Sequence, residues 1–227
     1  MKDYHYAILA SSLVTYRKYV KMGTKIDLAE QITAAVETLV SGGVVAFPTD
    51  TVYGLGAVYN NCDAIRRIYS IKGRSRTKAL PLIIADYHQL EEITSSISNC
   101  ARLLMQAFWP GALTLVLPRS GNVADDITGG LNTVAVRMPN HPVPLALAGR
   151  VGCAICATSA NISGRKSSAS VDEVKNQLGA LVDYIIYCQA AGCGTPSTLV
   201  DATGEIPKIL REGGIAFEQI NRICKTV

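Results

Sequence analysis

The chain has 227 residues, of which 48% are hydrophobic and 18% charged, and its formal net charge is +4. This length fits one large domain with a sizeable core, and the composition excludes a disordered chain. The positive balance suits an anionic partner such as a nucleotide or RNA, although it is too small to establish one.

Residues 1–24 are expected to form an N-terminal arm of unknown role, followed by a single domain over residues 25–227. The apolar stretch of the arm, residues 7–14, is too short to span a bilayer. The arm carries Asp3 early and shows no persuasive cleavage pattern for a signal peptide. No other segment is a candidate for a membrane span.

Apolar periodicity predicts the first helix of this domain over residues 26–40. Asp27 and Glu30 are placed like a capping box, and Gly42 and Gly43 are expected to end the helix. The further expected elements, in chain order, are a strand at 44–47, a helix at 63–71, a strand at 79–86, a helix at 100–109, strands at 112–118 and 133–138, a helix at 145–150, a strand at 153–159, a helix at 171–178, strands at 184–187, 197–201 and 207–211, and a helix at 217–224. This mixture predicts an α/β sandwich around a twisted sheet.

The seven cysteines do not resemble a disulfide scaffold, because an odd number cannot all pair. Cys153 and Cys156 have metal or redox spacing, but in an extended apolar run residues three apart face opposite sides, which favours the core. Cys188 and Cys193 lack a convincing second pair of ligands. Reduced thiols in a cytoplasmic protein are therefore expected.

The stretch FPTDTVYGL (residues 47–55) places three oxygen-bearing side chains, Thr49, Asp50 and Thr51, directly after the expected strand at 44–47. Such residues either stabilise a turn or form the rim of a ligand pocket. By itself the stretch does not decide between the two.

The stretch IKGRSRTKAL (residues 71–80) carries basic residues at alternate positions: Lys72, Arg74, Arg76 and Lys78. In an extended segment these four would project to one side and form a cationic strip. Guanidinium and ammonium groups at such a place bind phosphate oxygens. The alternative is a solvated loop of positive charge.

The stretch TVAVRMPNHP places Arg137 at the end of an apolar strand, where a buried arginine needs an anion. None is adjacent in sequence, so either a distant carboxylate or a ligand carboxylate or phosphate must supply it. His141, between Asn140 and Pro142, is expected to be a turn residue and not a catalytic base.

Three further polar stretches lie at strand ends. ATSANISGRKSSAS offers Ser159 and Asn161 as hydroxyl and amide groups, which either contact a ligand or cap a strand-to-helix loop. GTPSTLVD contributes Ser197 at a strand start, and ILREGG contributes Arg211 at a strand end. No nucleophile, P-loop or metalloprotease motif is present. The inventory suits binding and aligning a nucleotide and a small polar substrate.

Taken together and in this order, seven motifs resemble those of the YrdC/TsaC family, the threonylcarbamoyl-adenylate synthases of tRNA modification. They run from about Gly42 to Gly213, and they are PTDTVYGLG, KGRS, WPGALTLVL, VAVRMPNHP, TSANISG, PSTLVD and ILREG. The resemblance implies a twisted, mostly open mixed sheet with flanking helices around a basic concave cavity. The chain resembles the short, single-domain form.

The resemblance implies an L-threonylcarbamoyladenylate synthase, a nucleotidyltransferase that makes threonylcarbamoyl-AMP and pyrophosphate from L-threonine, bicarbonate and ATP. A partner complex then transfers the threonylcarbamoyl group to the adenosine next to the anticodon of ANN-reading tRNAs, the t6A modification. Mg²⁺ is expected to accompany ATP, with no metal ligand from the protein and no organic cofactor. The protein is expected to act with tRNA or the tRNA-modification complex, and not at a membrane.

The family's roles can be transferred motif by motif. Lys72 and Arg74 match the basic catalytic pair at the nucleotide phosphates. Arg137 matches the residue that pairs with the carboxylate of threonine, while Thr49 and Asp50 are expected only to shape the turn. The implied threonine-binding residues are Thr51, Arg137, Ser159 and Ser197, and the implied nucleotide-binding residues are Lys72, Arg74, Lys78, Thr133, Asn161 and Arg211.

Two positions depart from the family pattern. Ile83 stands near the place where many members have a substrate-binding histidine, and Ala169 replaces a hydroxyl residue whose contact Ser168 or Ser170 would have to supply. A related domain in hydrogenase-maturation proteins belongs to a far longer chain with acylphosphatase and zinc-finger regions. The remaining alternative is a non-catalytic module of the same fold that binds double-stranded RNA or tRNA through phosphates. The presence of Lys72 and Arg74 favours the enzyme.

Overall fold

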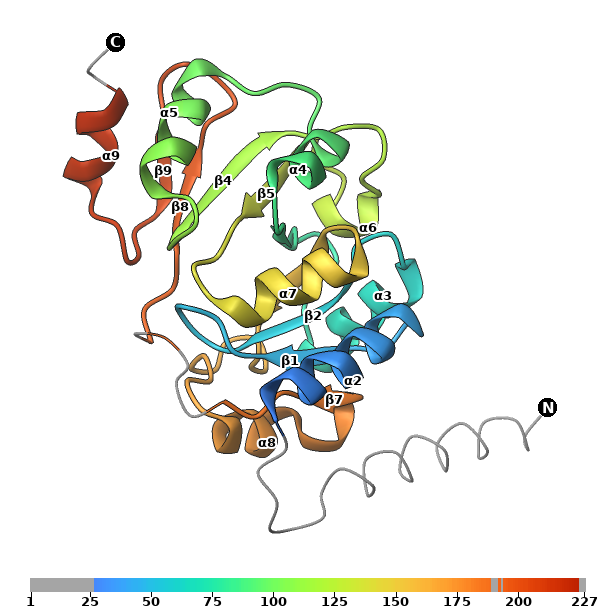
Figure 1. Cartoon of the computed structure of the whole chain (residues 1–227). Helices are drawn as coiled ribbons and strands as arrows, with labels where there is room; N and C mark the ends of the chain where they lie inside the picture. The colour runs from blue at the N-terminus through green and yellow to red at the C-terminus, as the bar shows by residue number, and fades with distance from the viewer. Residues whose placement is uncertain (1–26, 189–191, 193, 225–227) are drawn as a thin grey trace.

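The computed structural model describes residues 27–188, 192 and 194–224, and it is organised around one nine-stranded sheet (Figure 1). The strands lie in the order β7-β1-β2-β6-β3-β5-β4-β8-β9. Their bounds are β1 Val45–Phe47, β2 Gly54–Val58, β3 Leu82–Ile83, β4 Leu113–Pro118, β5 Thr133–Arg137, β6 Ile155–Ser159, β7 Tyr184–Ile185, β8 Thr198–Asp201 and β9 Lys208–Arg211. The arm predicted for residues 1–24 lies outside the described residues.

Helices flank the sheet and connect most of its strands. They are α2 Leu28–Val40, α3 Cys62–Lys72, α4 Tyr87–Ile93, α5 Asn99–Phe108, α6 Asp125–Thr128, α7 Pro142–Val151, α8 Val171–Leu178, the 3-10 helix η1 Gly179–Leu181 and α9 Phe217–Cys224. Parallel pairing joins β1 to β7, β3 to β5 and β4 to β8, and the other neighbours are antiparallel. The sheet is mixed and open, as the family resemblance implied, and β7 and β9 form its edges.

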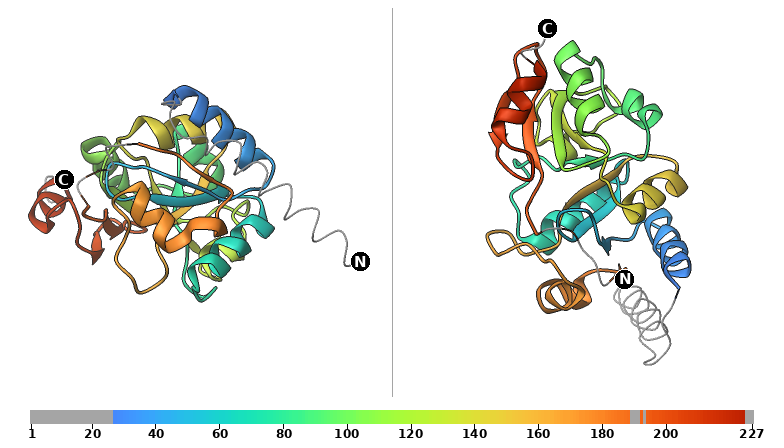
Figure 2. Two further views of the ribbon diagram at one scale, coloured as in Figure 1. Left: turned by 90° about the horizontal axis from the view of Figure 1, so that it is seen from below. Right: turned by 60° about the vertical axis from the view of Figure 1, so that its left-hand side comes forward.

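Alternating side chains divide the core between two faces of the sheet. On β1, Val45 and Phe47 pack in a cluster with residues of α2 and α7, whereas Ala46 packs with residues of α3 and α8 on the other side. This is the period-two pattern of a strand buried on both faces. Figure 2 (left) shows α2 and α7 on one side of this part of the sheet and α3 and α8 on the other.

The part of the sheet formed by β5, β4 and β8 is buried on one face and mostly half-buried on the other. On β5, Val134 and Val136 are buried, while Thr133 and Ala135 are half-buried; on β4, Leu115 is buried and Val116 half-buried. The half-buried face is the one that carries Arg137, four residues after Thr133 on β5. An uncovered face with a buried arginine at its margin is where a ligand can approach.

Several element predictions needed correction. Asp27 precedes α2 as expected, but its side chain makes no capping hydrogen bond, so the capping box is wrong. The strand predicted at 79–86 pairs only over Leu82–Ile83, because Asp86 turns the chain into α4 by accepting a bond from the Gln89 amide. Helix α4 and strand β2 were not predicted.

The described cysteines are free thiols. Cys156 lies on β6 within the core, and burial raises its pKa to about 12, so the prediction of a structural role is confirmed. Cys193 lies outside the described residues. The sulfurs of Cys100 and Cys224 lie 2.9 Å apart where α5 packs on α9.

Within the described residues, no helix has both the length and the apolar character needed to cross a bilayer.

Candidate functional site

Hydrogen bonds within the loop between β1 and β2 hold the hydroxyl groups of Thr49 and Thr51 in place. Thr49 Oγ1 donates to the Val52 carbonyl at 2.7 Å and lies 3.0 Å from Thr51 Oγ1. The amide of Thr51 donates to Thr49 Oγ1 at 3.1 Å. Thr51 is 2% exposed, so its hydroxyl is held in a fixed position with little access to bulk water.

Arg137, at the end of β5, lies against this loop and is 8% exposed. Its Nη1 donates to Thr51 Oγ1 at 2.8 Å, and its Nη2 pairs with Asp50 Oδ1 at 2.7 Å. Asp50 Oδ2 accepts the amide of Asn140 at 3.1 Å. A distant carboxylate therefore partners the arginine, and Asp50 does more than shape the turn. We call Asp50, Thr51 and Arg137 the Arg137 group.

The WPG part of the motif WPGALTLVL supplies a third contact to the Arg137 group. The carbonyl of Gly111 accepts Arg137 Nε at 2.9 Å, and the amide of Gly111 donates to Met138 at 2.8 Å. A Cβ at position 111 would lie 2.5 Å from the Phe108 carbonyl, so glycine is required for this close turn. Three contacts from two loops thus fix the guanidinium plane.

Lys72 is the last residue of α3, and its side chain is 2% exposed. Its Nζ donates to the backbone carbonyls of Ser159 and Asn161, the latter at 2.7 Å. Burial, together with the smaller effect of the nearby positive charge of Arg74, lowers the pKa of Lys72 to about 8. The ammonium thus joins the end of α3 to the end of β6.

The predicted cationic strip is wrong, because the segment is not extended. The helix continues through Lys72, ends at Gly73 in the left-handed conformation, and is followed by a turn in which the Lys78 amide donates to Ser75. Arg74 folds back onto the carbonyls of Lys78 and Ala79, at 3.3 and 2.9 Å. Arg76 and Lys78 are exposed. We call Lys72, Arg74 and Lys78 the Lys72 group.

The end of β6 connects the two groups. The Ala160 amide donates to the Tyr53 carbonyl at 2.7 Å, two residues after Thr51, while Ser159 and Asn161 on either side of Ala160 accept from Lys72. The side-chain Nδ2 of Asn161 donates to the backbone carbonyls of Ile162 and Arg165, at 2.9 and 2.7 Å. Asn161 therefore stabilises its own loop, which was the structural alternative for this residue.

Ser197 and Arg211 meet beside β4, where β8 begins and β9 ends. Ser197 Oγ lies 2.7 Å from Thr114 Oγ1, and Arg211 Nη2 donates to the Ser197 carbonyl at 2.8 Å. A Cβ at Gly213 would lie 2.2 Å from the Pro196 carbonyl, so the glycine allows the chain after β9 to approach this turn. The neighbouring residue Thr198 donates its amide to Ala112, next to Gly111, which links this pair to the Arg137 group.

Thr133 is the one predicted site residue that stands apart. It pairs with Pro118 at the start of β5, about 13 Å from Arg137 along the strand at 3.3 Å per residue. His141 accepts the Val143 amide at 3.2 Å as the N-cap of α7, which confirms its role in a turn.

The residues at and beside the two positions that depart from the family pattern have structural contacts of their own. Ile83 is packed in the apolar cluster beneath α2 and α7. Ser168 is fully buried and donates to the Ala160 carbonyl at 2.6 Å, and Ser170 caps α8 by accepting the Glu173 amide.

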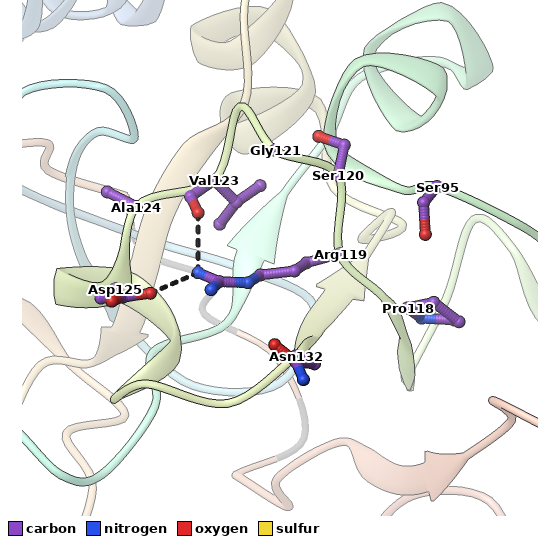
Figure 3. A pocket seen from close by; sticks show the side chains of 9 residues that line it. All are labelled: Ser95, Pro118, Arg119, Ser120, Gly121, Val123, Ala124, Asp125 and Asn132. Atoms are coloured by element: carbon purple, nitrogen blue, oxygen red, sulfur yellow. Dashed lines mark hydrogen bonds and ion pairs between the residues drawn. The ribbon is translucent and has the colours of Figure 1, made fainter.

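A cavity of about 630 Å³ lies beyond the start of β5 (Figure 3), and none of the predicted site residues lines it. Its arginine, Arg119, is ion-paired with Asp125 at 2.6 Å and donates to the Val123 carbonyl at 3.0 Å. Asn132, which precedes Thr133, is the lining residue next to a predicted nucleotide contact. Because the arginine is already neutralised, this cavity is a weaker phosphate site than the Lys72 group.

Two electrostatic environments therefore lie side by side along one hydrogen-bonded network. The Arg137 group contains one cation and one carboxylate, so its net charge is zero. The Lys72 group has no carboxylate partner among the described residues, since the buried Lys72 and the half-buried Arg74 contact only carbonyl oxygens. A neutral, hydrogen-bonding group suits a zwitterion, and an unneutralised basic group suits a polyanion.

Within the described residues, no three His, Cys, Asp or Glu side chains gather to hold a metal ion.

Comparison with known proteins reveals extensive similarity. The Sua5/YciO/YrdC family model, described as "Telomere recombination", matches residues 37–213. A Bacillus subtilis threonylcarbamoyl-AMP synthase is 44% identical over 85% of this chain and 56% of its own length. A Vibrio vulnificus threonylcarbamoyl-AMP synthase is 37% identical over 82% of this chain and 100% of its own length.

The fold is also similar to that of Pyrococcus abyssi Sua5 in complex with L-threonine. The TM-score is 0.84 at 42% identity, over 88% of this chain and 58% of that one. The chain spans little more than half the length of some of the relatives that it matches.

Proposed function

The chain belongs to the Sua5/YciO/YrdC family, and from this membership and the geometry of its site we propose that it is a threonylcarbamoyl-AMP synthase. The substrates are L-threonine, bicarbonate and ATP, and the products are threonylcarbamoyl-AMP and pyrophosphate. The relatives from Bacillus subtilis and Vibrio vulnificus carry the name of this activity, and a Pyrococcus abyssi relative was crystallised with L-threonine.

The observation that carries the proposal is the pairing of a neutral group with a cationic group in one network. Threonine is a zwitterion, and the Arg137 group offers it a guanidinium, a carboxylate and a hydroxyl. ATP is a polyanion, and the Lys72 group offers it basic side chains without a neutralising carboxylate. The Tyr53–Ala160 backbone bond holds the two groups next to each other.

Catalysis in this proposal is mainly a matter of positioning. The amine of threonine and bicarbonate form a carbamate with loss of water, and a carbamate oxygen attacks the α-phosphorus of ATP while the bond to pyrophosphate breaks. The Lys72 group stabilises the charge that moves onto the leaving pyrophosphate. The Arg137 group orients the amino acid so that its nitrogen faces the nucleotide.

The remaining assignments follow from this reaction. Mg²⁺ arrives with ATP and lowers the charge repulsion among the phosphates. The product is passed to a transferase complex that modifies tRNA, and the protein works in the cytoplasm, where its thiols remain reduced. Ser159, Ser197, Asn161 and Arg211 lie along the network and are proposed as further contacts to threonine and nucleotide, and Thr133 as a nucleotide contact at the far end of β5.

The test is pyrophosphate release by the purified chain, with ATP, threonine and bicarbonate omitted one at a time, and mass spectrometry of the nucleotide product. Release that requires all three substrates and yields threonylcarbamoyl-AMP supports the proposal. Salt-sensitive binding of double-stranded RNA without turnover would identify the chain as a non-catalytic RNA-binding module instead.

A further inference from the structure

The hydroxyl of Thr49 uses every hydrogen-bonding position that it has. A threonine hydroxyl offers one proton and accepts two hydrogen bonds. The Val52 carbonyl, 2.7 Å away, has no proton, so Thr49 must donate its only proton there. The amide of Thr51 occupies one acceptor position of Thr49, at 3.1 Å. The second acceptor position faces Thr51 Oγ1, at 3.0 Å.

This saturation decides the direction of the bond between the two hydroxyls. Because the proton of Thr49 is committed to Val52, Thr51 is the donor and Thr49 the acceptor. Thr51 Oγ1 also accepts from Arg137 Nη1 at 2.8 Å. Its proton and one lone pair are then used, and no other described residue bonds to its second lone pair.

We propose that Thr49 is a positioning residue that fixes the Thr51 hydroxyl as an acceptor, so that the substrate group received there is a hydrogen-bond donor. This inference rests on the proposed function, in which threonine is the substrate at the Arg137 group. A carboxylate has no proton to donate, so it is directed to other groups of the site. The donors that threonine offers are its amino group and its side-chain hydroxyl.

A fixed acceptor has a consequence for specificity. A hydroxyl that is free to rotate can donate or accept and therefore discriminates poorly, whereas one that only accepts leaves an analogue without the matching donor unpaired. The residue that sets this preference, Thr49, need not touch the substrate at all. Its burial and its three bonds keep the proton in place.

The test measures threonine affinity by calorimetry and the KM values for threonine and ATP, in the full chain and its variants. Thr49→Val should weaken threonine binding about tenfold, the loss expected for one oriented hydrogen bond, while the KM for ATP stays the same. Thr49→Ser, which keeps the hydroxyl, should restore the affinity. Thr38→Val, which removes a hydroxyl bonded to the Ala34 carbonyl on α2, is the matched control without effect.

A double-mutant cycle separates orientation from a general structural role. If Thr49 acts only through Thr51, Thr49→Val adds nothing to the loss caused by Thr51→Ala. Additive losses, an equal rise in the KM for ATP, or a Thr49→Ser variant as weak as Thr49→Val would overturn the inference. Should Thr49→Val fail to fold, Thr49→Cys, with its weaker acceptor, should show the same pattern at smaller amplitude.

Two analogues identify the donor group. If the side-chain hydroxyl is received, Thr49→Val loses the preference for threonine over 2-aminobutyrate; if the amine is received, it loses the preference over 3-hydroxybutyrate, which has no donor at the α-carbon. Unchanged preferences against both analogues would contradict the inference. Wild-type protein that binds threonine but releases no pyrophosphate would refute the synthase alone, because the binding data still decide the role of Thr49. Wild-type protein that does not bind threonine would refute both.

Discussion

The Arg137 group and the Lys72 group both contain a buried cation, but they differ in how that cation is compensated. Arg137 faces the carboxylate of Asp50 at 2.7 Å, and its charge is neutralised within the protein. Lys72 is at least as well buried, yet its ammonium contacts only carbonyl oxygens. Burying a cation without a counter-charge is costly, and burial lowers its pKa, as it does at Lys72.

This difference indicates what each group is prepared to receive. A neutral pair already holds its geometry before a ligand arrives, which suits selection of a small zwitterion. An uncompensated cation gains most when a polyanion binds, because the ligand supplies the missing counter-charge. The contrast predicts that substitutions in the two groups affect different substrates.

The largest effect is expected from Lys72→Ala and Arg74→Ala. Each should lower kcat/KM for ATP by about 10²–10³-fold, because a group that stabilises charge on the phosphates is removed. Arg76→Ala, which removes an exposed arginine two residues after Arg74, is the matched control and should retain activity. Product formation at the normal rate by both Lys72→Ala and Arg74→Ala would show that the Lys72 group does not bind the nucleotide.

Arg137→Lys is expected to lower kcat/KM for threonine about a hundredfold, because lysine cannot reproduce the separate contacts of the guanidinium to Thr51, Asp50 and Gly111. The KM for ATP should change little. Arg119→Lys perturbs a more exposed arginine–aspartate pair outside the Arg137 group and serves as control. A rise in the KM for ATP, with threonine unaffected, would reverse the assignment of the two groups.

Asp50→Asn keeps the shape of the side chain but removes its charge. Loss of a charge-assisted bond should lower kcat/KM for threonine about thirtyfold, because the guanidinium loses its orienting carboxylate. The variant also makes the Arg137 group cationic, so an anionic analogue without an amine should bind relatively better than before. Unchanged selectivity between threonine and 2,3-dihydroxybutyrate would argue against the neutral-group interpretation.

The smallest effect is a pH dependence that originates at Lys72. Its pKa is lowered to about 8, so the side chain is charged below pH 8 and loses its charge as the pH rises through that value. We expect kcat/KM for ATP to fall about fivefold between pH 8 and pH 9, in proportion to the charged fraction of Lys72. Lys72→Arg, which does not titrate in this range, should show no such fall. The pH profile of kcat/KM checks both statements.

The fold could be predicted from the sequence to a large extent because apolar periodicity and glycine positions mark most of the elements. The short strands could not be predicted in this way, because β2 contains two glycines and has no apolar run, and β3 is only two residues long. The predicted strip from Lys72 to Lys78 failed because helical hydrogen bonding continues through Lys72, which places that side chain inside the protein.

The sequence indicated which stretches of the chain form the site, but not which residues within them pair with one another. Arg137 was expected to need an anion, yet Asp50 lies 87 residues away in sequence, and one sequence carries no signal that pairs them. The sequence feature that pointed to such a partner was the carboxylate of Asp50, which lies beside Thr51 directly after a predicted strand. The role of Thr49 depends on three distances within the loop, which no spacing rule contains.

The most direct measurement is a pair of saturation curves, for threonine and for ATP, recorded by pyrophosphate release from Arg74→Ala and Arg137→Lys at residual activity. Separate binding groups predict a raised KM for ATP in Arg74→Ala and a raised KM for threonine in Arg137→Lys, each with the other KM near its wild-type value. A raised KM for the same substrate in both variants would contradict the account.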